Sequence, residues 1–232
     1  MISIIVPAHN EENNLKKLVP LLKKMGDDNS FEILIALSSK NSDASEKLLQ
    51  DFGVRFIKCT RLGRARQMND AVKESIGDTI VFLHADVVPP KSFLTDIQDA
   101  FANGYEAGFF SYRFDKESFL LKINASFTGR DGIFTGGGDQ CLFIKKEIFE
   151  QLGTFNEEQV LMEDFEFFNR MKRSKVRYKI IKNDLIVSAR KYSKNSYVRV
   201  NLSNLLLMTL FKLGYPSKKL KSLHNRLLET TY

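Results

Sequence analysis

Short apolar runs alternate with helix-like segments through the first half of the chain, and this alternation restricts the fold more than any other feature. Strands are predicted at runs rich in Ile, Val, Leu and Phe, namely Ile2–Pro7, Glu32–Leu37, Val54–Lys58 and Thr79–His84. Helices are predicted between them, where apolar residues recur at helical spacing, over Glu11–Met25, Asp43–Phe52 and Gly63–Ile76. Such alternation builds right-handed strand–helix–strand units. The expected fold class is therefore α/β, with a Rossmann-like, mostly parallel central sheet flanked by helices.

The alternation becomes less regular after Pro90. The pattern there predicts helices over Lys91–Asn103 and Glu117–Phe127, and extended segments over Glu106–Phe114 and Cys141–Lys145. Two C-terminal helices complete the expected architecture. The first is Leu-rich and covers Tyr197–Leu213, and the second is basic and follows Pro216.

Length and composition indicate a chain with one substantial core, because it has 232 residues of which 43% are hydrophobic. It opens without a basic leader, and we expect neither a signal peptide nor a membrane span. The two cysteines, Cys59 and Cys141, form neither a disulfide framework nor a metal-site spacing. This usage is typical of a reducing compartment, so we expect a cytoplasmic protein.

Positive charge is concentrated toward the C-terminus. From residue 173 onward the chain carries 14 Lys and Arg against 2 acids, whereas the first 172 residues carry 21 against 26. Apolar residues of the Leu-rich helix recur at helical spacing between basic flanks. They are Leu202, Leu205, Leu206, Leu210 and Leu213, and the flanking cations are Arg199, Lys212, Lys218, Lys219 and Lys221. This segment either lies at an anionic membrane interface or packs onto the body or a second subunit.

The fourth predicted strand delivers an acid, Asp86, just before a Pro89-Pro90 break. Ligands of open α/β sheets bind at the carboxyl ends of strands. Mg²⁺ or Mn²⁺ on a diphosphate needs only one or two carboxylates, so Asp86 alone is a sufficient metal ligand, with a turn acceptor as the alternative. We expect His84, on the same strand face, to line the pocket, because imidazole matches Mg²⁺ poorly.

A second acidic pair, Glu163 and Asp164, begins a helical pattern with a Phe-rich apolar face. Acids at a helix start are stabilised by the helix dipole alone. Because adjacent side chains point in different directions, however, one of the two can act as a general base while the other orients its neighbours. In combination with the strand-end aspartate, the pair predicts a catalytic site.

Two further segments suit an anionic ligand. Arg61, Arg64 and Arg66 surround Gly63 at a predicted helix start, where N–H groups and guanidinium forks bind anions, although a solvated helix end is the alternative. The segment from Pro7 to Glu12 follows the first strand. It either forms a nucleotide floor or simply starts the next helix with Asn10 as its cap.

These motifs, taken in order, resemble those of family 2 glycosyltransferases. Ser3–Glu12 resembles the opening of that family, Phe82–Asp86 its DxD strand, and Met162–Asp164 its acidic ED motif. Further segments are similar to a compact bacterial subgroup of the family, namely Gly138–Gln140, Leu152–Phe155 and Ser188–Tyr192. The resemblance covers essentially the whole chain.

The resemblance implies a GT-A fold and an inverting, metal-dependent transfer of a sugar from a nucleoside-diphosphate donor to a hydroxyl acceptor, lipid-linked acceptors included. Asp86 would bind Mg²⁺ or Mn²⁺, and Asp164 would deprotonate the acceptor with Glu163 beside it. The implied donor-binding residues are Pro7, His9, Asn10, Glu11, Arg64, Arg66, His84, Ala85 and Arg190. The implied sugar and acceptor pocket comprises Gly138, Asp139 and Gln140.

The sequence departs from the family pattern twice. His84 occupies the first DxD position, and no acid stands in Ala36–Lys40, where the family carries one after its second strand. Asp43 is the nearest acid and better suits a helix cap.

The resemblance divides the chain into a catalytic domain over 1–190 and a basic, Leu-rich helical tail over 191–232, packed on that domain or at an interface. Within the domain, 1–115 would be the nucleotide-sugar half and 116–190 the acceptor half.

Two other functions compete with sugar transfer. A sugar nucleotidyltransferase would carry a Gly-rich loop after its first strand, and the segment from Pro7 to Glu12 has none. A non-catalytic protein that binds nucleotides or anionic surfaces is favoured by the basic tail, by the aromatic residues between basic ones at 177–179 and 190–192, and by the two departures from the family pattern. We expect no nucleic-acid partner, because the sheet half is acidic and carries no nucleic-acid motif. A homodimer and a peripheral contact with an anionic membrane both stay open.

Overall fold

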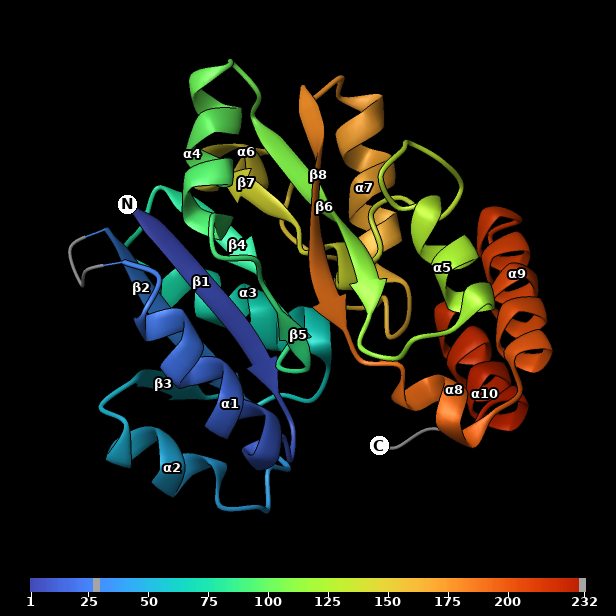
Figure 1. The fold of residues 1–232 in the computed structure, drawn as a ribbon, viewed down its shortest axis with the longest axis horizontal. Coiled ribbons are helices and arrows are strands. Elements are labelled where there is room, and N and C mark those ends of the chain that lie inside the picture. The colour runs from blue at the N-terminus through green and yellow to red at the C-terminus, as the bar shows by residue number, and fades with distance from the viewer. Residues whose placement is uncertain (27–29, 230–232) are drawn as a thin grey trace.

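The computed structural model describes residues 1–26 and 30–229, which form one curled sheet with helices on both faces (Figure 1). The strands are β1 (Ile2–Ala8), β2 (Phe31–Leu37), β3 (Arg55–Lys58), β4 (Thr79–Phe82), β5 (Val87–Val88), β6 (Ala107–Phe114), β7 (Phe143–Lys145) and β8 (Tyr178–Val187). The helices are α1 (Glu12–Lys23), α2 (Ser45–Asp51), α3 (Arg64–Glu74), α4 (Phe93–Ala102), α5 (Phe119–Ser126), α6 (Lys146–Gln151), α7 (Glu163–Arg173), α8 (Arg190–Lys194), α9 (Tyr197–Lys212) and α10 (Ser217–Leu227), with a 3₁₀ turn η1 at Gly138–Gln140.

The strand order is β3-β2-β1-β4-β7-β6-β8-β5. β1 pairs in parallel with both β2 and β4, β2 with β3, and β6 with β8, whereas β7 and β5 are antiparallel to their neighbours. The predicted α/β class with a mostly parallel sheet is therefore confirmed. Successive strands are added on opposite sides of β1, so β1 and β4 flank a topological switch point where ligands of such sheets bind.

Two hydrophobic cores sandwich the sheet, because the central strands bury side chains on both faces. One core lies under α1, α2 and α4 and includes the helical stripe Leu15, Leu18 and Leu22. The other lies under α3, α6 and α7 and is rich in phenylalanine, with Phe149 and Phe167 fully buried. The packing fixes the start of α3 and the start of α7 against the sheet, and both helix starts carry site residues.

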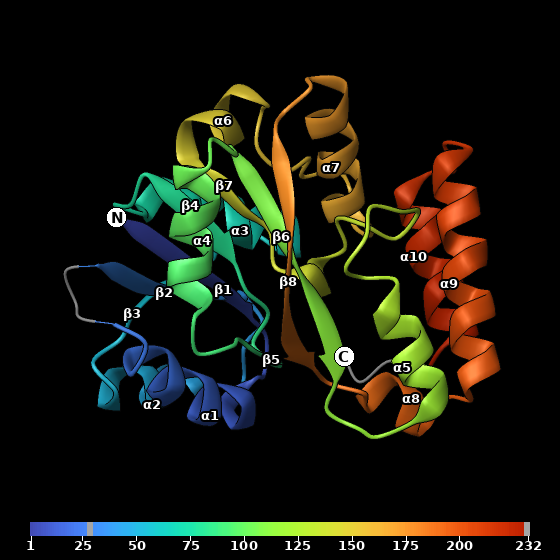
Figure 2. The ribbon, with the colours of Figure 1, turned by 45° about the horizontal axis from the view of Figure 1, so that its top comes forward.

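The C-terminal helices lie beside α5, away from the first four strands (Figures 1 and 2). Asn124 of α5 donates to Asn201 of α9 at 3.0 Å, and Tyr197 of α9 donates to Asn124 at 2.7 Å. α9 also packs against α10, where Arg199 Nε donates to the Leu227 carbonyl at 2.6 Å. Within residues 1–26 and 30–229, every helix is too short or too polar to cross a bilayer.

The local structure differs from the sequence predictions in several places. The sequence did not predict β8, although this strand is the longest of the sheet, nor the short helix α6. β4 ends at Phe82 rather than at His84, so His84 and Asp86 lie in a turn closed by Val87 N donating to His84 O at 3.2 Å. Asn10 does not cap α1. Its side chain instead accepts from Ser42 N at 2.8 Å and ties the loop after β1 to the loop after β2.

Asp43, rather than Asn10, accepts the hydrogen bond from the first backbone N–H group of α1. Asp43 Oδ2 accepts from Glu12 N, the first residue of α1, at 2.8 Å, and its Oδ1 accepts from Ser45 N, the first residue of α2, at 3.1 Å. These bonds hold the pKa of Asp43 below its usual value despite partial burial. The acid nearest to the second strand therefore acts as a cap for two helices.

Candidate active site

The site forms where β1 and β4 end side by side. Leu83 N donates to Ile5 O at 3.0 Å, which brings the turn after β4 against the end of β1. The predicted nucleotide floor, Pro7 to Glu11, therefore faces the turn that holds His84, Ala85 and Asp86. His9 Nδ1 is buried and has no hydrogen-bond partner among residues 1–26 and 30–229. A buried imidazole nitrogen without a partner is costly, and a ligand at this edge would provide one.

Arg190 bridges two carboxylates at this edge. Its Nη2 lies 3.3 Å from Glu11 Oε1 and 3.3 Å from Asp86 Oδ2. Glu11 is buried and also accepts a hydrogen bond from Asn14 Nδ2. Arg190 is the first residue of α8, so residues nearly 180 positions apart in the sequence meet here. We call Glu11, Asp86 and Arg190 the Arg190 cluster.

A second arginine holds the acidic pair. Arg64, the first residue of α3, donates from Nε to Glu163 Oε1, and its Nη2 lies 3.5 Å from Asp164 Oδ2. Its Nη1 also lies 3.2 Å from His84 Nε2. Met162, directly before the pair, has a φ of 63°, a strained left-handed conformation for such a residue, and strain of this kind concentrates at functional sites. We call Arg64, His84, Glu163 and Asp164 the Arg64 cluster.

The 3₁₀ turn η1 closes the Arg64 cluster. Gly138 N donates to Asp164 Oδ2 at 2.5 Å, while Phe165 N donates to Asp164 Oδ1 at 2.8 Å. A Cβ atom on Gly138 would lie only 2.5 Å from the His84 ring, so this position accepts no side chain unless the ring moves. Asp139 is exposed, with its Oδ1 3.6 Å from His84 Nδ1, and Gln140 is buried and donates to the Thr128 carbonyl at 3.0 Å.

The two neighbouring acids differ in their ionisation. Burial raises the pKa of Asp164; Arg64 offsets only part of this rise, and the Glu163 carboxylate adds to it. Burial also opposes ionisation of Glu163, but Arg64 lowers the pKa of Glu163 below its usual value. Glu163 is therefore the fixed counter-charge of Arg64, whereas Asp164 is poised to take up a proton.

The structure brings most of the predicted site residues together, but not all. Arg66 lies on the outer side of α3, where its Nη2 contacts Glu158 at 3.2 Å, and Arg61 contacts Asp70 at 2.9 Å. Two lysines of the tail lie closer to the site than the sequence indicated. Lys221 interacts with the charges of Arg64 and Glu163, and Lys191 with that of Asp139. The Ser188–Tyr192 motif contains Lys191, but no motif marked Lys221, whose proximity depends on how the tail helices pack.

The residues around Asp86 fit a divalent metal only together with a ligand. Among residues 1–26 and 30–229, no group of three His, Cys, Asp or Glu side chains could hold a metal ion. Asp86 offers hard carboxylate oxygens, and burial raises the pKa of Asp86 while Arg190 only partly offsets this. A diphosphate would supply the remaining oxygens that Mg²⁺ or Mn²⁺ needs.

The cavity between Arg64, His84, Gly138 and Asp164 measures only ≈ 20 Å³, so the charged side chains must shift to admit a substrate.

A sequence model of the family described as Glycosyl transferase family 2 matches residues 3–178. The chain belongs to glycosyltransferase family 2. The matched segment contains both carboxylate ends of the site, Asp86 and Asp164, but stops short of Arg190 and the tail.

A curated relative, the dolichol-phosphate mannosyltransferase of Pyrococcus furiosus, is 25% identical over 108 residues, which represent 44% of this chain and 30% of the relative. Among solved structures, mannosyltransferase PcManGT from Pyrobaculum calidifontis has a TM-score of 0.68 at 18% identity, covering 97% of this chain and 69% of that one. S. aureus TarS also scores 0.68, at 14% identity over 90% of this chain and 39% of TarS. Glucosyl-3-phosphoglycerate synthase from Mycobacterium tuberculosis scores 0.62 at 16% identity, covering 93% and 81%. The fold is GT-A, as the motifs predicted.

Proposed function

We propose that this glycosyltransferase moves a sugar, with inversion, from a nucleoside-diphosphate donor to a hydroxyl acceptor, and that it uses a divalent metal. The observation that carries the proposal is the presence, at one switch point, of a partly buried Asp164 held by two backbone donors and of a separate carboxylate, Asp86, just after β4. Separate carboxylates suit separate tasks, namely proton removal and donor binding. A nucleotidyltransferase receives less support, since the family match spans both acids.

Asp164 is the proposed general base. It takes the proton of the acceptor hydroxyl while the acceptor oxygen forms a bond to the anomeric carbon. The bond from that carbon to the diphosphate breaks at the opposite face, and its electron pair leaves with the diphosphate, so the configuration inverts. The backbone donors Gly138 and Phe165 keep the Asp164 carboxylate oriented. Glu163 fixes Arg64 beside it.

Donor binding is assigned to the edge formed by the ends of β1 and β4. Asp86 would hold Mg²⁺ or Mn²⁺, which when bound neutralises charge on the departing diphosphate. Arg190 and Arg64 would contact the diphosphate, which requires Arg190 to exchange carboxylates for phosphates. The nucleoside would lie on the remaining donor residues, Pro7, His9, Asn10, Glu11, His84 and Ala85. Arg66 would reach the donor only by leaving its acidic partners.

Two structural relatives support the use of a nucleotide donor and a divalent metal. The PcManGT structure contains GDP-Man and Mn²⁺, and the glucosyl-3-phosphoglycerate synthase structure contains Mn²⁺ and UDP.

We assign residues 1–115 to the nucleotide-sugar half and 116–190 to the acceptor half, with Gly138, Asp139 and Gln140 in the acceptor pocket. Residues 191–232 form the tail, of which 230–232 lie outside the described residues. We place the reaction in the cytoplasm, at its membrane face when the acceptor is lipid-linked, with a homodimer as an alternative assembly.

A donor panel tests the proposal. UDP- and GDP-sugars are added with and without Mn²⁺, and the unfolding temperature and the release of nucleoside diphosphate are measured. A donor at 100 times its Kd stabilises the fold by about 2.7 kcal/mol, or roughly 5–10 °C for a chain of this size. We expect one nucleotide base to give such a shift, and a larger one with Mn²⁺. If no nucleotide sugar raises the unfolding temperature, the proposal fails.

A further inference from the structure

Two neighbouring helices expose an unusual amount of apolar surface. On α5 and directly after it, the side chains of Phe119, Leu120, Ile123 and Phe127 are between 39% and 78% exposed. On α9, Val198, Leu202, Leu205 and Leu206 are between 44% and 63% exposed. Within each set the residues recur every three or four positions, so each set occupies one face of its helix. Contiguous exposed apolar patches of this kind mark interaction sites.

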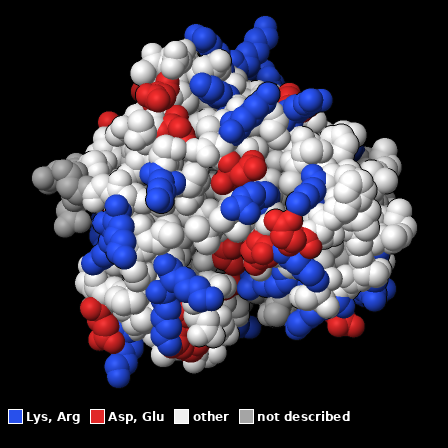
Figure 3. All heavy atoms as spheres, in the orientation of Figure 1, with Lys and Arg blue, Asp and Glu red and all other residues white. Residues whose placement is uncertain are grey.

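The two apolar faces form one surface. Asn124 joins α5 to α9 through hydrogen bonds, and both helices lead away from α8, whose Tyr192 ring contacts Phe114 just before α5 (Figure 2). Ile123 directly precedes Asn124 and Leu202 directly follows Asn201, so each lies about 100° around its helix from the seam, in opposite senses. Because the two helices run side by side in the same direction, both faces point to the same side (Figure 2). Figure 3 shows an area over α5 and α9 that is largely free of charged side chains. We call these eight residues the α5/α9 surface.

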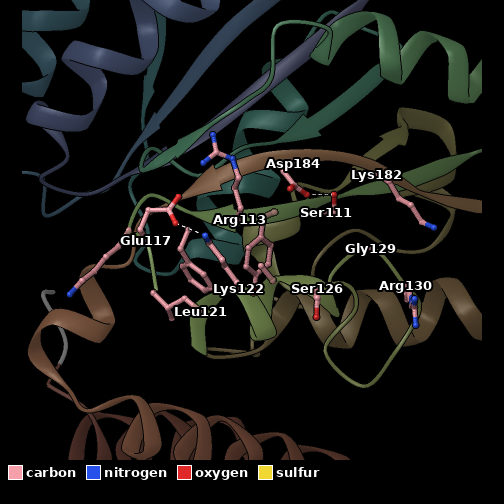
Figure 4. A pocket seen from close by; sticks show the side chains of 14 residues that line it. Ser111, Arg113, Glu117, Leu121, Lys122, Ser126, Gly129, Arg130, Lys182 and Asp184 are labelled. Carbon is pink, nitrogen blue, oxygen red and sulfur yellow. Dashed lines mark hydrogen bonds and ion pairs between the residues drawn. The ribbon is translucent and has the colours of Figure 1, made fainter. Parts of the chain in front are cut away.

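A basic groove borders this surface. A cavity of ≈ 570 Å³ lies between α5 and the strands β6 and β8, and it is much larger than the cavity in the Arg64 cluster (Figure 4). Its lining includes five cations, Arg113, Lys116, Lys122, Arg130 and Lys182, against two acids. Both acids are engaged, since Glu117 pairs with Lys122 and Asp184 accepts from Ser111 at 2.5 Å.

The groove therefore keeps a net positive charge, because its five cations outnumber its two carboxylates. In the part of the chain that the structure describes, Arg113, Lys116, Arg130 and Lys182 form no ion pair. The tail adds to this charge, because residues 190–229 carry nine Lys and Arg against the single acid Glu229. One side of α5 thus faces solvent with apolar side chains, while the side that carries Leu121 and Ser126 lines a basic groove.

We propose that the α5/α9 surface docks on an anionic lipid bilayer, with the apolar side chains among the acyl chains and the basic groove at the headgroup phosphates. Apolar residues flanked by Lys and Arg are what binding at an anionic interface requires. A second copy of this chain fits less well, because a twofold contact would bring the same uncompensated cations of both copies together. Charge complementarity therefore selects the bilayer as the occupant.

Docking in this way orients the site. Phe127 of the surface is followed directly by Thr128, whose carbonyl accepts a hydrogen bond from Gln140 of η1, so the acceptor side of the Arg64 cluster is joined to the docked face. The acceptor would then be a hydroxyl presented at the bilayer. This last conclusion depends on the proposed sugar transfer, whereas the docking itself does not.

Vesicle cosedimentation tests the docking without measuring turnover. We expect the wild type to bind vesicles that contain phosphatidylglycerol, and to bind less at high salt and on pure phosphatidylcholine. The double variant Phe119→Ser/Leu202→Ser should bind at least 10-fold more weakly. The control Ile76→Ser, which alters a residue 68% exposed just after α3, should bind like the wild type. Arg130→Ala/Lys182→Ala should lose roughly 10-fold on anionic vesicles, and Lys40→Ala/Lys47→Ala, with the same charge change, should lose little.

Unfolding midpoints equal to that of the wild type show that these surface variants fold. The proposal is overturned if the wild type ignores anionic vesicles at low salt, or if the Phe119→Ser/Leu202→Ser variant binds them undiminished. A wild-type dimer that the same double variant converts to a monomer, with no vesicle binding by either, would also overturn it and would assign the surface to a second copy. Failure of the proposed sugar transfer leaves all these vesicle results unchanged.

Discussion

The Arg64 cluster and the Arg190 cluster each surround an arginine with carboxylates, but they are built in different ways. Arg64 begins a core helix and touches Glu163, Asp164 and His84, which all belong to segments packed on the sheet. Arg190 begins the short helix α8 beside the sheet and reaches Glu11 and Asp86, each at 3.3 Å. The comparison teaches that Asp164 is held by the core packing of α3 and α7, whereas Asp86 is paired by a residue that enters from the C-terminal part of the chain.

The largest expected effect tests the donor side. Asp86→Ala removes the proposed metal carboxylate from a turn rather than from the apolar core, so we expect transfer to fall below detection while the fold persists. Release of nucleoside diphosphate with Mn²⁺ and a thermal melt measure the two properties. Asp51→Ala, at an exposed acid of α2, is the matched control and should keep wild-type turnover. Near wild-type turnover of Asp86→Ala at limiting Mn²⁺ would remove Asp86 from the donor site.

The next effect tests the proton-accepting side. Asp164→Asn keeps the size of the side chain but cannot take a proton, so turnover should fall roughly 10²-fold or more. In the wild type, the rate should decline as the pH falls through the pKa of Asp164, which burial raises above the ordinary 3.8. A pH–rate profile measures this acid limb. The residual activity of Asp164→Asn should lack it, and an unchanged limb would assign the base to another residue.

Alanine substitutions at two glycines test whether the close contact between η1 and the His84 ring matters for turnover. A methyl group on Gly138 collides with the His84 ring, so Gly138→Ala should displace that ring from Arg64 and lower turnover roughly 10-fold. Gly132 has no atom within 4 Å of an added Cβ, so Gly132→Ala is the matched control. Steady-state turnover of both variants measures the difference. Equal activities would show that the close approach of Gly138 to His84 has no functional role.

The smallest expected effect concerns folding stability, to which Asp164 and Glu163 should contribute with opposite dependence on pH. The raised pKa of Asp164 means that this group stabilises the fold when protonated, below pH 3.8, and that this stability is lost as the pH rises through its folded pKa. The lowered pKa of Glu163 has the opposite sign: its stability is present above pH 4.5 and is lost as the pH falls through the folded pKa. At neutral pH, Asp164→Asn should therefore raise the unfolding midpoint slightly.

Glu163→Gln should lower the free energy of unfolding by about 1–2 kcal/mol, since it leaves Arg64 without its buried partner. Thermal melts of the two variants at pH 7 measure both effects. Shifts of the same sign in both would contradict the different ionisation of the two neighbours.

The sequence predicted the first four strands well because parallel strands buried on both faces read as continuous apolar runs. β8 escaped prediction because Lys179, Lys182 and Asp184 interrupt its apolar residues, and its strand conformation depends on pairing with the distant β6. For the same reason the approach of Lys221 could not be predicted, because it depends on how the tail helices pack. The family resemblance placed Arg190 and Asp86 together at the donor, but the direct bridge between them was not predicted.

The acids of the site could be found from the sequence because each follows or begins a recognisable element. Their partners could not be found in this way. Arg64 and Arg66 lie two positions apart in a single helix start, yet Arg64 meets the acidic pair while Arg66 meets Glu158 on the surface. The direction of a side chain at the first turn of a helix depends on the packing of the whole helix, which sequence spacing leaves open.

Donor titration by calorimetry tests the division between the two clusters most directly. The donor selected by the panel is titrated into the wild type, Asp86→Ala and Asp164→Asn, each with and without Mn²⁺. We predict that Mn²⁺ tightens donor binding by the wild type and by Asp164→Asn to a similar extent, and that Asp86→Ala binds weakly with no response to Mn²⁺. Equal loss of affinity in both variants, or a Mn²⁺ response that survives in Asp86→Ala, would contradict the account.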